Sequence, residues 1–200
     1  MKITFLDAST VDAGDINLDC IREHGDLIIH STTSNNETLQ RVIDSEIIIT
    51  NKVIIDKPII EASKKLKLIV VSATGYNNID VDAANANNVT VCNVVDYSTP
   101  IVAQHTISLI LNLCGQTYKY LNEKSLWPAS PIFTRLDHRV TEISGKTLGI
   151  VGVGNIGSKV GEIAESMGMK IQVLARKDSK SLIHQEWPRL EYASFFENSD

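Results

Sequence analysis

The chain has 200 residues, of which 43% are hydrophobic, with 19 basic and 24 acidic side chains. Its apolar runs are far shorter than the roughly 18 residues of a membrane span, and its basic residues do not cluster with aromatic ones. We therefore expect a soluble globular protein that binds neither a membrane nor nucleic acid. The first ten residues show no secretion signal, so we expect the protein in the cytoplasm. The three cysteines lack ligand spacing, which predicts buried, reduced thiols and no metal site.

The first hundred residues alternate strand-like and helix-like segments. The strand-like runs are 2–7, 26–30, 46–50, 66–72 and 89–94. Helical spacing is found in 37–44 and 57–66, and less clearly in 80–88. Nearly continuous apolar strands between helices favour a parallel sheet that is covered on both faces. The sequence thus predicts a flavodoxin-like α/β domain over residues 1–98, on the substrate side of the protein.

A long helix is predicted next. Ser98 or Thr99 can cap it, and apolar residues continue at helical spacing, which indicates a helix over about 99–123. We expect this helix to link the first domain to a second one over residues 99–200. Residues 126–145 are rich in turn-forming residues and have no clear period, so we expect an extended connection there.

Three glycines then follow an apolar run at 148–153 with the spacing Gly-x-Gly-x-x-Gly. Gly152 would permit a tight turn, Gly154 would let the backbone approach a diphosphate, and Gly157 would let a helix pack on the strand. The amino end of that helix, at Asn155 and Ile156, would offer N–H groups and a positive dipole to the phosphates.

The segment after the glycines completes a βαβ unit. Its apolar residues share one helix face, and these are Ile156, Val160, Ile163, Ala164 and Met167. Gly168 is predicted to end the helix, and a second strand is predicted over 170–174. The sequence therefore predicts the start of a Rossmann domain, a doubly wound parallel sheet that binds a dinucleotide.

The second strand is followed by Ala175, where NAD-binding units usually place an acidic residue against the ribose. Arg176 could pair with a 2′-phosphate in a fork, and Lys177 could add a point charge. This pattern favours NADP over NAD as the cofactor. Two solvated charges at a strand end, with Asp178 nearby, are the alternative interpretation.

Two segments carry a resemblance to a known family. They read ATGYNNIDVDAANANNVTVCNVVDYSTPIVAQHTISLIL (73–111) and ISGKTLGIVGVGNIGSKVGEIAESMGMKIQVLAR (143–176), and they resemble the D-isomer-specific 2-hydroxyacid dehydrogenases. The chain is most similar to the glycerate dehydrogenase (hydroxypyruvate reductase) group, where loops such as ITNK (49–52) and ATGYN (73–77) recur. The resemblance implies NAD(P)H-dependent reduction of a small 2-keto acid, hydroxypyruvate or glyoxylate, to the D-2-hydroxy acid.

The resemblance also implies roles for two loops. The loop of Ala73, Thr74 and Gly75 would offer N–H groups to the substrate carboxylate and lie beside the nicotinamide. It follows an apolar strand at its carboxyl end, where open α/β sheets bind ligands, although a simple turn is the alternative. Asn51 and Lys52 match the second loop, and Lys52 would add positive charge unless it is merely exposed.

The linker helix carries two further candidates. By resemblance alone, Val102 would be an apolar neighbour of the nicotinamide. His105 attracts attention because histidine titrates near neutral pH, but the family does not use it as the proton donor, and we expect a structural role.

The family completes its chemistry with an arginine, a glutamate and a histidine. All three lie downstream of the second nucleotide-domain strand, so we expect them beyond residue 200 and assign no catalytic residue in this chain. The 200-residue chain itself is expected to be inactive, with a nucleotide sheet of two strands and residues 191–200 just before a third. The alternatives are a truncated product, a catalytically inactive regulatory module, or a methyltransferase, which fits poorly because a five-strand domain precedes the glycines.

The resemblance finally implies a homodimer of the full-length protein. In the family, subunits pair through the nucleotide domains, using the linker helix and the extension after it. Four apolar residues of the extension suit such a contact, and these are Leu126, Trp127, Ile132 and Phe133. Packing of these residues against their own domain is the alternative.

Overall fold

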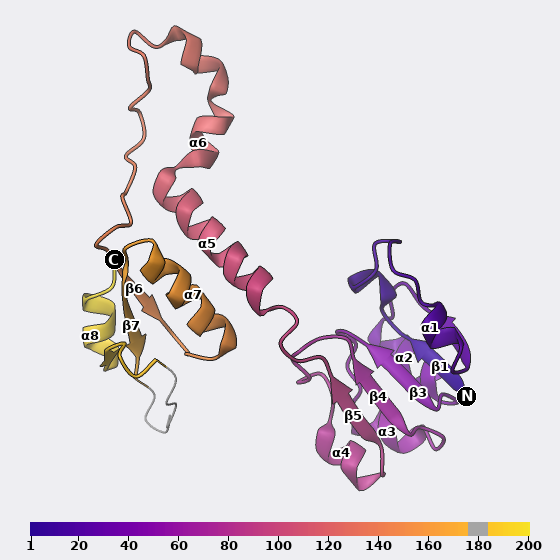
Figure 1. Ribbon diagram of the computed structural model, residues 1–200. Coiled ribbons are helices and arrows are strands. Elements are labelled where there is room, and N and C mark those ends of the chain that lie inside the picture. Colours follow the sequence, from indigo (N-terminus) through magenta and orange to yellow (C-terminus); the bar gives the residue numbers. More distant parts are fainter. Residues whose placement is uncertain (176–183) are drawn as a thin grey trace. The chain divides into compact units, whose positions relative to one another are not determined.

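The computed structural model of the chain describes residues 1–175 and 184–200 (Figure 1). The chain forms two compact units, residues 1–96 and 97–200. In the described part of the chain, no helix is long and apolar enough to cross a membrane.

The first unit is built on five parallel strands. These are β1 (Lys2–Phe5), β2 (Asp26–Ile29), β3 (Ile47–Thr50), β4 (Leu68–Val71) and β5 (Thr90–Asn93). They pair in the order β2-β1-β3-β4-β5. The strand runs expected from the sequence are therefore confirmed, and this strand order is the flavodoxin-like one.

Short helices connect these strands. They are η1 (Ala8–Thr10), α1 (Asp19–Arg22), α2 (Asn35–Val42), α3 (Lys57–Ala62) and α4 (Val81–Ala86). Asp56 and Asp80 cap α3 and α4 by accepting hydrogen bonds from the backbone N–H groups of Ile59 and Ala83. The cap explains why α4 forms despite its weak apolar pattern, because a side-chain cap stabilises a helix by about 1 kcal/mol.

Apolar side chains pack on both faces of the first sheet. On one face Ile48 and Ile69 lie in a cluster that includes Val42 of α2 and Ile60 of α3. On the other face the cluster contains Ile3, Phe5 and Ile49, with Ile21 of α1 packed against it. Burial of both faces accounts for the nearly continuous apolar runs of the strands.

The second unit starts with helices. They are α5 (Thr99–Gly115), α6 (Thr117–Asn122) and the 3₁₀ helix η2 (Lys124–Ala129). The expected single helix over 99–123 is wrong, because Gln116 adopts a left-handed conformation (φ 52°) that separates α5 from α6. Glutamine is an ordinary helix former, so nothing in its side chain indicates this break.

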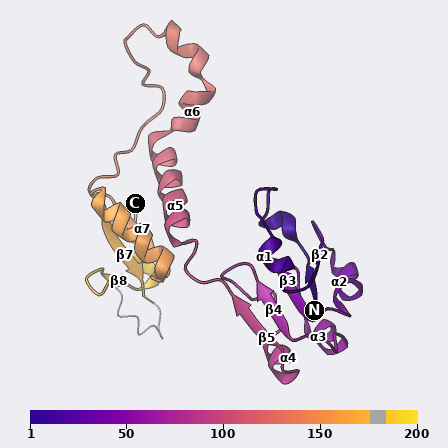
Figure 2. The same cartoon turned by 45° about the vertical axis from the view of Figure 1, so that its right-hand side comes forward.

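A three-stranded parallel sheet follows in the second unit. Its elements are β6 (Thr147–Ile150), α7 (Asn155–Ser166), β7 (Lys170–Leu174), β8 (Arg189–Leu190) and α8 (Tyr192–Glu197), and the strand order is β6-β7-β8. In both views α7 lies along the strands (Figures 1 and 2). Buried residues of α5, α7, β6 and β7 form one core, and these are Ala103, Ile107, Val160, Ala164, Ile150, Ile171 and Val173, together with Trp187.

The structure corrects the expected end of the chain. The sheet has a third strand, β8, and residues 191–200 follow this strand instead of preceding it. The buried side chain of Gln172 donates hydrogen bonds to the Phe195 carbonyl and the Ser199 hydroxyl, at 2.8 and 2.7 Å, which holds α8 against β7. A strand of two residues is too short to show an apolar period, so β8 could not be recognised from the sequence.

The expected burial of the cysteines is also wrong. Cys20 and Cys92 are exposed and Cys114 is half-buried, since they lie on a one-turn helix, on the edge strand of the first sheet and near the end of α5. Ile156 is 38% exposed because it lies in the first turn of α7, at the helix end. In contrast, Gly168 ends this helix with φ 87°, as predicted.

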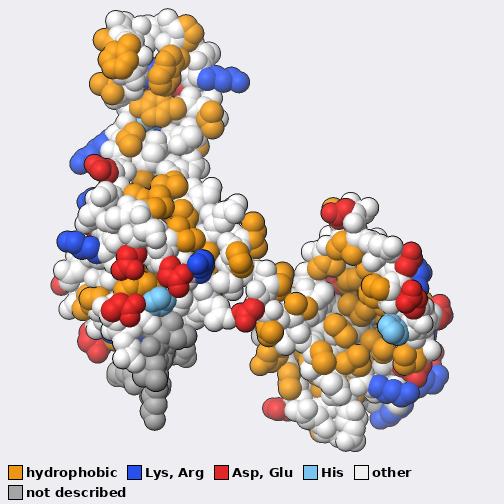
Figure 3. Space-filling model, in the orientation of Figure 1, with side chains coloured by type: hydrophobic (Ala, Val, Ile, Leu, Met, Phe, Trp, Pro, Cys, Tyr) orange, Lys and Arg blue, Asp and Glu red, His pale blue; other side chains and the backbone are white. Residues whose placement is uncertain are grey.

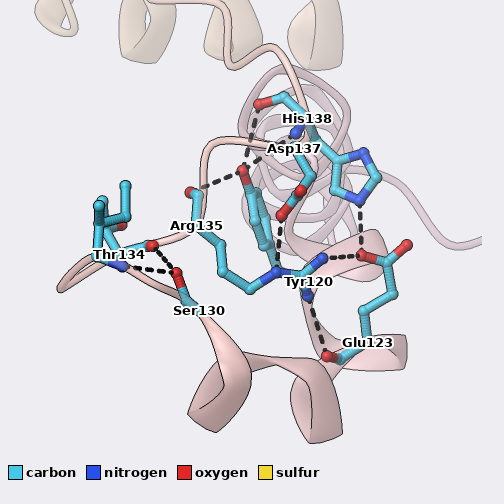
Figure 4. Close-up of polar contacts among 8 residues, drawn as sticks. Tyr120, Glu123, Ser130, Thr134, Arg135, Asp137 and His138 are labelled. Carbon is cyan, nitrogen blue, oxygen red and sulfur yellow. Dashed lines mark hydrogen bonds and ion pairs between the residues drawn. The ribbon is translucent and has the colours of Figure 1, made fainter.

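Residues 116–140 leave and rejoin the second unit, and we call them the arm. The Thr141 N–H donates a hydrogen bond to the Cys114 carbonyl, 2.9 Å away, so the two ends of the arm meet. Inside the arm, the Glu123 carboxylate accepts hydrogen bonds from Arg135 and His138, each at 2.9 Å (Figure 4). The Tyr120 hydroxyl lies within 3.3 Å of the Arg135 and His138 carbonyls. The arm therefore has a polar centre.

Candidate functional site

The three glycines form the turn between β6 and α7. Gly152 has φ 96°, which an L side chain rarely adopts. A methyl group added at Gly157 would lie 2.2 Å from the Gly152 carbonyl oxygen, so only glycine lets the helix approach the strand this closely. A methyl group at Gly154 would meet no atom within 4 Å. The space beside Gly154 is therefore open, while the other two positions are fixed by the turn itself.

Gly154 is also the N-terminal cap of α7. Its backbone is extended and no side chain caps the helix there. The first turn of α7 contains Asn155, Ile156 and Gly157, and the amino end of a helix carries a partial positive charge. This open, uncapped turn fits a diphosphate, because backbone N–H groups and the helix dipole both favour an anion.

The end of β7 is the second part of the dinucleotide site that the sequence predicts. The Ala175 N–H donates a 2.8 Å hydrogen bond to the Leu190 carbonyl, which fixes the residue just after the strand. The residues expected to read the cofactor phosphate, Arg176 and Lys177, lie outside the described residues.

Helix α5 carries the two other sequence candidates in this unit. Val102 and His105 are both exposed, whereas their neighbours Ala103 and Ile107 are buried in the core with residues of α7. Val102 lies in the first turns of the helix, with its N–H bonded to the Ser98 carbonyl at 2.9 Å. Its side chain is thus available to a ligand.

The predicted substrate loops lie side by side in the first unit. Strands β3 and β4 are paired neighbours, and the Ser72 N–H bonds the Thr50 carbonyl at 2.9 Å just beyond their ends. Asn51 and Lys52 leave the carboxyl end of β3, and the loop 73–77 leaves that of β4. Ala73 is buried, Asn51 is half-buried, and Lys52, Thr74 and Gly75 are exposed. The topology thus brings all five predicted substrate residues to the carboxyl ends of two neighbouring strands.

A buried carboxylate holds the first of these loops, and sequence reasoning missed it. Asp7 is 3% exposed and follows β1, the neighbour of β3. Its two carboxylate oxygens accept the backbone N–H groups of Asn51 and Lys52, at 2.9 and 2.7 Å. The available signal was an acidic residue directly after the strand-like run KITFL.

A side chain from β5 holds the second loop. The Asn93 carboxamide donates a 2.8 Å hydrogen bond to the Thr74 carbonyl, and the Val94 N–H bonds the Ala73 carbonyl at 3.1 Å. A pocket of about 260 Å³ adjoins this loop and is lined by Tyr76, Val81, Val91 and Asn93. Within the described residues, no group of three or more His, Cys, Asp or Glu side chains could hold a metal ion.

Similarity to known proteins extends over nearly the whole chain. A family model described as "D-isomer specific 2-hydroxyacid dehydrogenase, catalytic domain" matches residues 6–194. A hydroxypyruvate reductase of Blautia hydrogenotrophica is 29% identical over 205 residues, which cover 100% of this chain and 64% of the relative. A glycerate dehydrogenase of Methylorubrum extorquens is 33% identical over 172 residues, covering 85% of this chain and 54% of the relative. The chain thus spans somewhat more than half the length of these curated relatives.

Solved structures have the same fold. An acyclic imino acid reductase in complex with NADPH and D-Arg superimposes with a TM-score of 0.78 at 26% identity, over 100% of this chain and 63% of that chain. An NAD-dependent formate dehydrogenase from Staphylococcus aureus in complex with NAD gives a TM-score of 0.73 at 22% identity, with the same coverage. The second likeness bears on the fold alone.

Proposed function

This chain belongs to the D-isomer-specific 2-hydroxyacid dehydrogenases, and from that membership we propose that it binds a nicotinamide dinucleotide and a small 2-keto acid. The whole protein would reduce this acid, of the hydroxypyruvate or glyoxylate type, to the D-2-hydroxy acid. The observation that carries the proposal is the glycine turn, where Gly152 and Gly157 are required by geometry and Gly154 faces open space at an uncapped helix end.

The second unit would hold the cofactor. Its diphosphate would lie on the first turn of α7 at Gly154, Asn155 and Ile156, with Val102 as an apolar neighbour of the nicotinamide. The basic residues Arg176 and Lys177 support NADP as the preferred form, because an acidic residue that would repel a 2′-phosphate is absent from positions 175–177. A solved relative at 26% identity is described in complex with NADPH, which supports a nicotinamide dinucleotide in general.

The first unit would hold the keto acid. The backbone N–H groups of the loop at Thr74 and Gly75 would bind the substrate carboxylate, with Thr74 also beside the nicotinamide, and Lys52 would add positive charge. When bound, the cofactor supplies a hydride to C2 of the keto acid. The substrate class is supported by the names of two relatives, a hydroxypyruvate reductase and a glycerate dehydrogenase.

The remaining chemistry would come from elsewhere in the protein. Reduction of a ketone also needs a cation to polarise the carbonyl and an acid to protonate the new hydroxyl. We place the family's arginine, glutamate and histidine outside residues 1–200 and give no residue of this chain a catalytic role. His105 is exposed on α5, and its structural role stays a prediction from the sequence.

The proposal is tested by following oxidation of NADPH and NADH with hydroxypyruvate. The 200-residue chain is compared with the product of the complete reading frame. We expect nucleotide binding by both, turnover by the longer product alone, and faster turnover with NADPH. Nucleotide binding without turnover in either product would instead favour a regulatory module.

We also propose that the whole protein forms a homodimer through the arm. Apolar side chains gather on this segment, at the top of Figure 3, and among them Phe133 is 97% exposed. The others that we expected to make contacts, Leu126, Trp127 and Ile132, are 53%, 45% and 52% exposed. Exposed apolar surface of this kind marks protein interfaces. We expect light scattering to show a dimer and Phe133→Asp to give a monomer, whereas a monomeric parent protein would refute the proposal.

A further inference from the structure

We infer that Asn93 is a positioning residue that directs the Gly75 N–H toward the carboxylate of the substrate. The inference rests on the proposed function, since it concerns how that same loop is held. It follows from one contact, the 2.8 Å hydrogen bond from the Asn93 carboxamide to the Thr74 carbonyl.

The geometry of the peptide bond links these residues. The Thr74 carbonyl and the Gly75 N–H belong to one trans peptide group, so they point in opposite directions within one plane. Asn93 lies at the end of β5 and draws the Thr74 oxygen toward that strand. The Gly75 N–H must therefore point away from β5. A single side chain thus sets the direction of a donor that belongs to another residue.

The loop tip has few other constraints of its own. Ala73 is buried and is tied to β5 by the bond from the Val94 N–H, but Thr74, Gly75 and Tyr76 are all exposed. A methyl group at Gly75 would make only ordinary contact, 3.6 Å from the Asn77 side-chain oxygen. Packing therefore does not fix the peptide between Thr74 and Gly75, and the bond from Asn93 does.

The chemistry of an amide side chain suits this role. Its NH₂ group donates to a carbonyl oxygen without bringing a charge that would compete for the substrate carboxylate. An aspartate in its place would have no proton to donate at neutral pH and would repel both the Thr74 carbonyl and an anionic ligand. We therefore expect Asn93→Asp to be more harmful than Asn93→Ala, although aspartate matches the shape of asparagine.

A matched control is available in the same unit. The Asn87 carboxamide donates a 2.9 Å hydrogen bond to the Ala83 carbonyl at the end of α4. Asn87 precedes β5, whereas Asn93 ends it, so the two residues lie at opposite ends of this strand. Asn87→Ala removes an equivalent bond and leaves the substrate loops untouched.

The test is a titration of the 200-residue chain with hydroxypyruvate, followed by the backbone amide NMR signals. In the ligand-free protein, Asn93→Ala should shift the Gly75 signal and speed its hydrogen exchange, while Asn87→Ala should do neither. The dissociation constant for hydroxypyruvate should rise about tenfold in Asn93→Ala and further in Asn93→Asp, with NADPH affinity unchanged.

Two failures can be told apart in this experiment. If the parent protein binds hydroxypyruvate and Asn93→Ala leaves both the Gly75 signal and the affinity unchanged, the inference is overturned and the proposed function stands. If the parent protein does not bind hydroxypyruvate, the proposed substrate fails. The ligand-free Gly75 signal then decides, since a shift in Asn93→Ala supports the positioning and an unchanged signal refutes it.

Discussion

Gly154 and Gly157 lie three residues apart in the same turn, but the fold requires a glycine only at the second of these positions. At Gly157 a methyl group would strike the Gly152 carbonyl oxygen, so this glycine serves the contact between helix and strand. At Gly154 a methyl group would enter empty space, and the backbone angles there suit any residue. The fold therefore requires glycine at position 157, whereas only a bound ligand would require glycine at position 154.

Alanine at each position makes the distinction measurable. We expect Gly154→Ala to unfold at the parental temperature and to bind NADPH at least tenfold more weakly. Gly157→Ala should lose about 1–3 kcal/mol of unfolding free energy through overpacking. Thermal unfolding and a fluorescence titration with NADPH check both expectations. Normal NADPH affinity in Gly154→Ala would remove this turn from the proposed site.

Asp7 offers a second prediction at this scale. Because its carboxylate accepts two N–H groups in a buried position, Asp7→Ala leaves both donors unpaired, which should cost about 1–3 kcal/mol of unfolding free energy. Asp12→Ala is the control, since the half-buried Asp12 also accepts backbone N–H groups, but from the exposed residues Gly14, Asp15 and Ile16. Urea unfolding of both variants should show a large loss for the first and little for the second.

Among the elements, the arm is held together by a network of charged side chains around Glu123. The hydrogen bond from His138, and then that from Arg135, hold the pKa of the Glu123 carboxyl below its usual value. Arg135 is largely covered, with 9% of its side chain exposed, and also bonds the Asp137 carboxylate at 2.7 Å. The arm thus keeps its shape through a network whose central acceptor is ionised.

This arrangement predicts that the arm is sensitive to acid. A carboxyl whose pKa is lowered on folding stabilises the arm above its unfolded pKa, about 4.3, and this stabilisation is lost as the pH falls through the folded value. Hydrogen exchange, corrected for the intrinsic effect of pH, should show faster opening of residues 117–140 in that range, with the sheets protected. Glu123→Gln should open the arm at neutral pH, whereas Asp44→Asn, which breaks an exposed ion pair with Lys65, should not.

Elements with a strong period could be predicted from the sequence, and elements fixed by single contacts could not. The five strands of the first unit and the end of α7 at Gly168 were foreseen because apolar spacing and a C-terminal glycine are local signals. The break at Gln116 and the strand β8 were not, since one depends on a backbone angle and the other on pairing with β7. The hydrogen bonds by which Asp7 and Asn93 hold the substrate loops could not be predicted either, because they join residues far apart in the chain.

At the scale of the whole molecule, the proposed cofactor-binding residues around the glycine turn and the proposed substrate loops belong to different units. The glycine turn lies within residues 97–200, and the two substrate loops lie within residues 1–96. Each unit has its own sheet and its own buried core. Binding of one ligand should therefore not require the other.

Titrating the chain with each ligand alone would test whether the two ligands bind to different units. We expect NADPH alone to shift amide signals around Gly154 and Asn155, and hydroxypyruvate alone to shift those around Thr74 and Gly75. Chemical-shift mapping on the 200-residue chain makes the comparison. Hydroxypyruvate shifts confined to residues 97–200 would show that the substrate loops are wrongly assigned.

The hydrogen bond between the Thr141 N–H and the Cys114 carbonyl has a consequence for how such a protein can change over time. The arm starts and ends at the same point, so a change in its length alters mainly the entropy cost of closing a loop. Each doubling of a loop's length raises that free-energy cost by only about 0.6 kcal/mol. Residues of the arm can therefore be inserted, deleted or replaced together while α5 stays packed on α7. Changes in the arm would thus alter the proposed contact between subunits without disturbing the turn that we propose binds the dinucleotide.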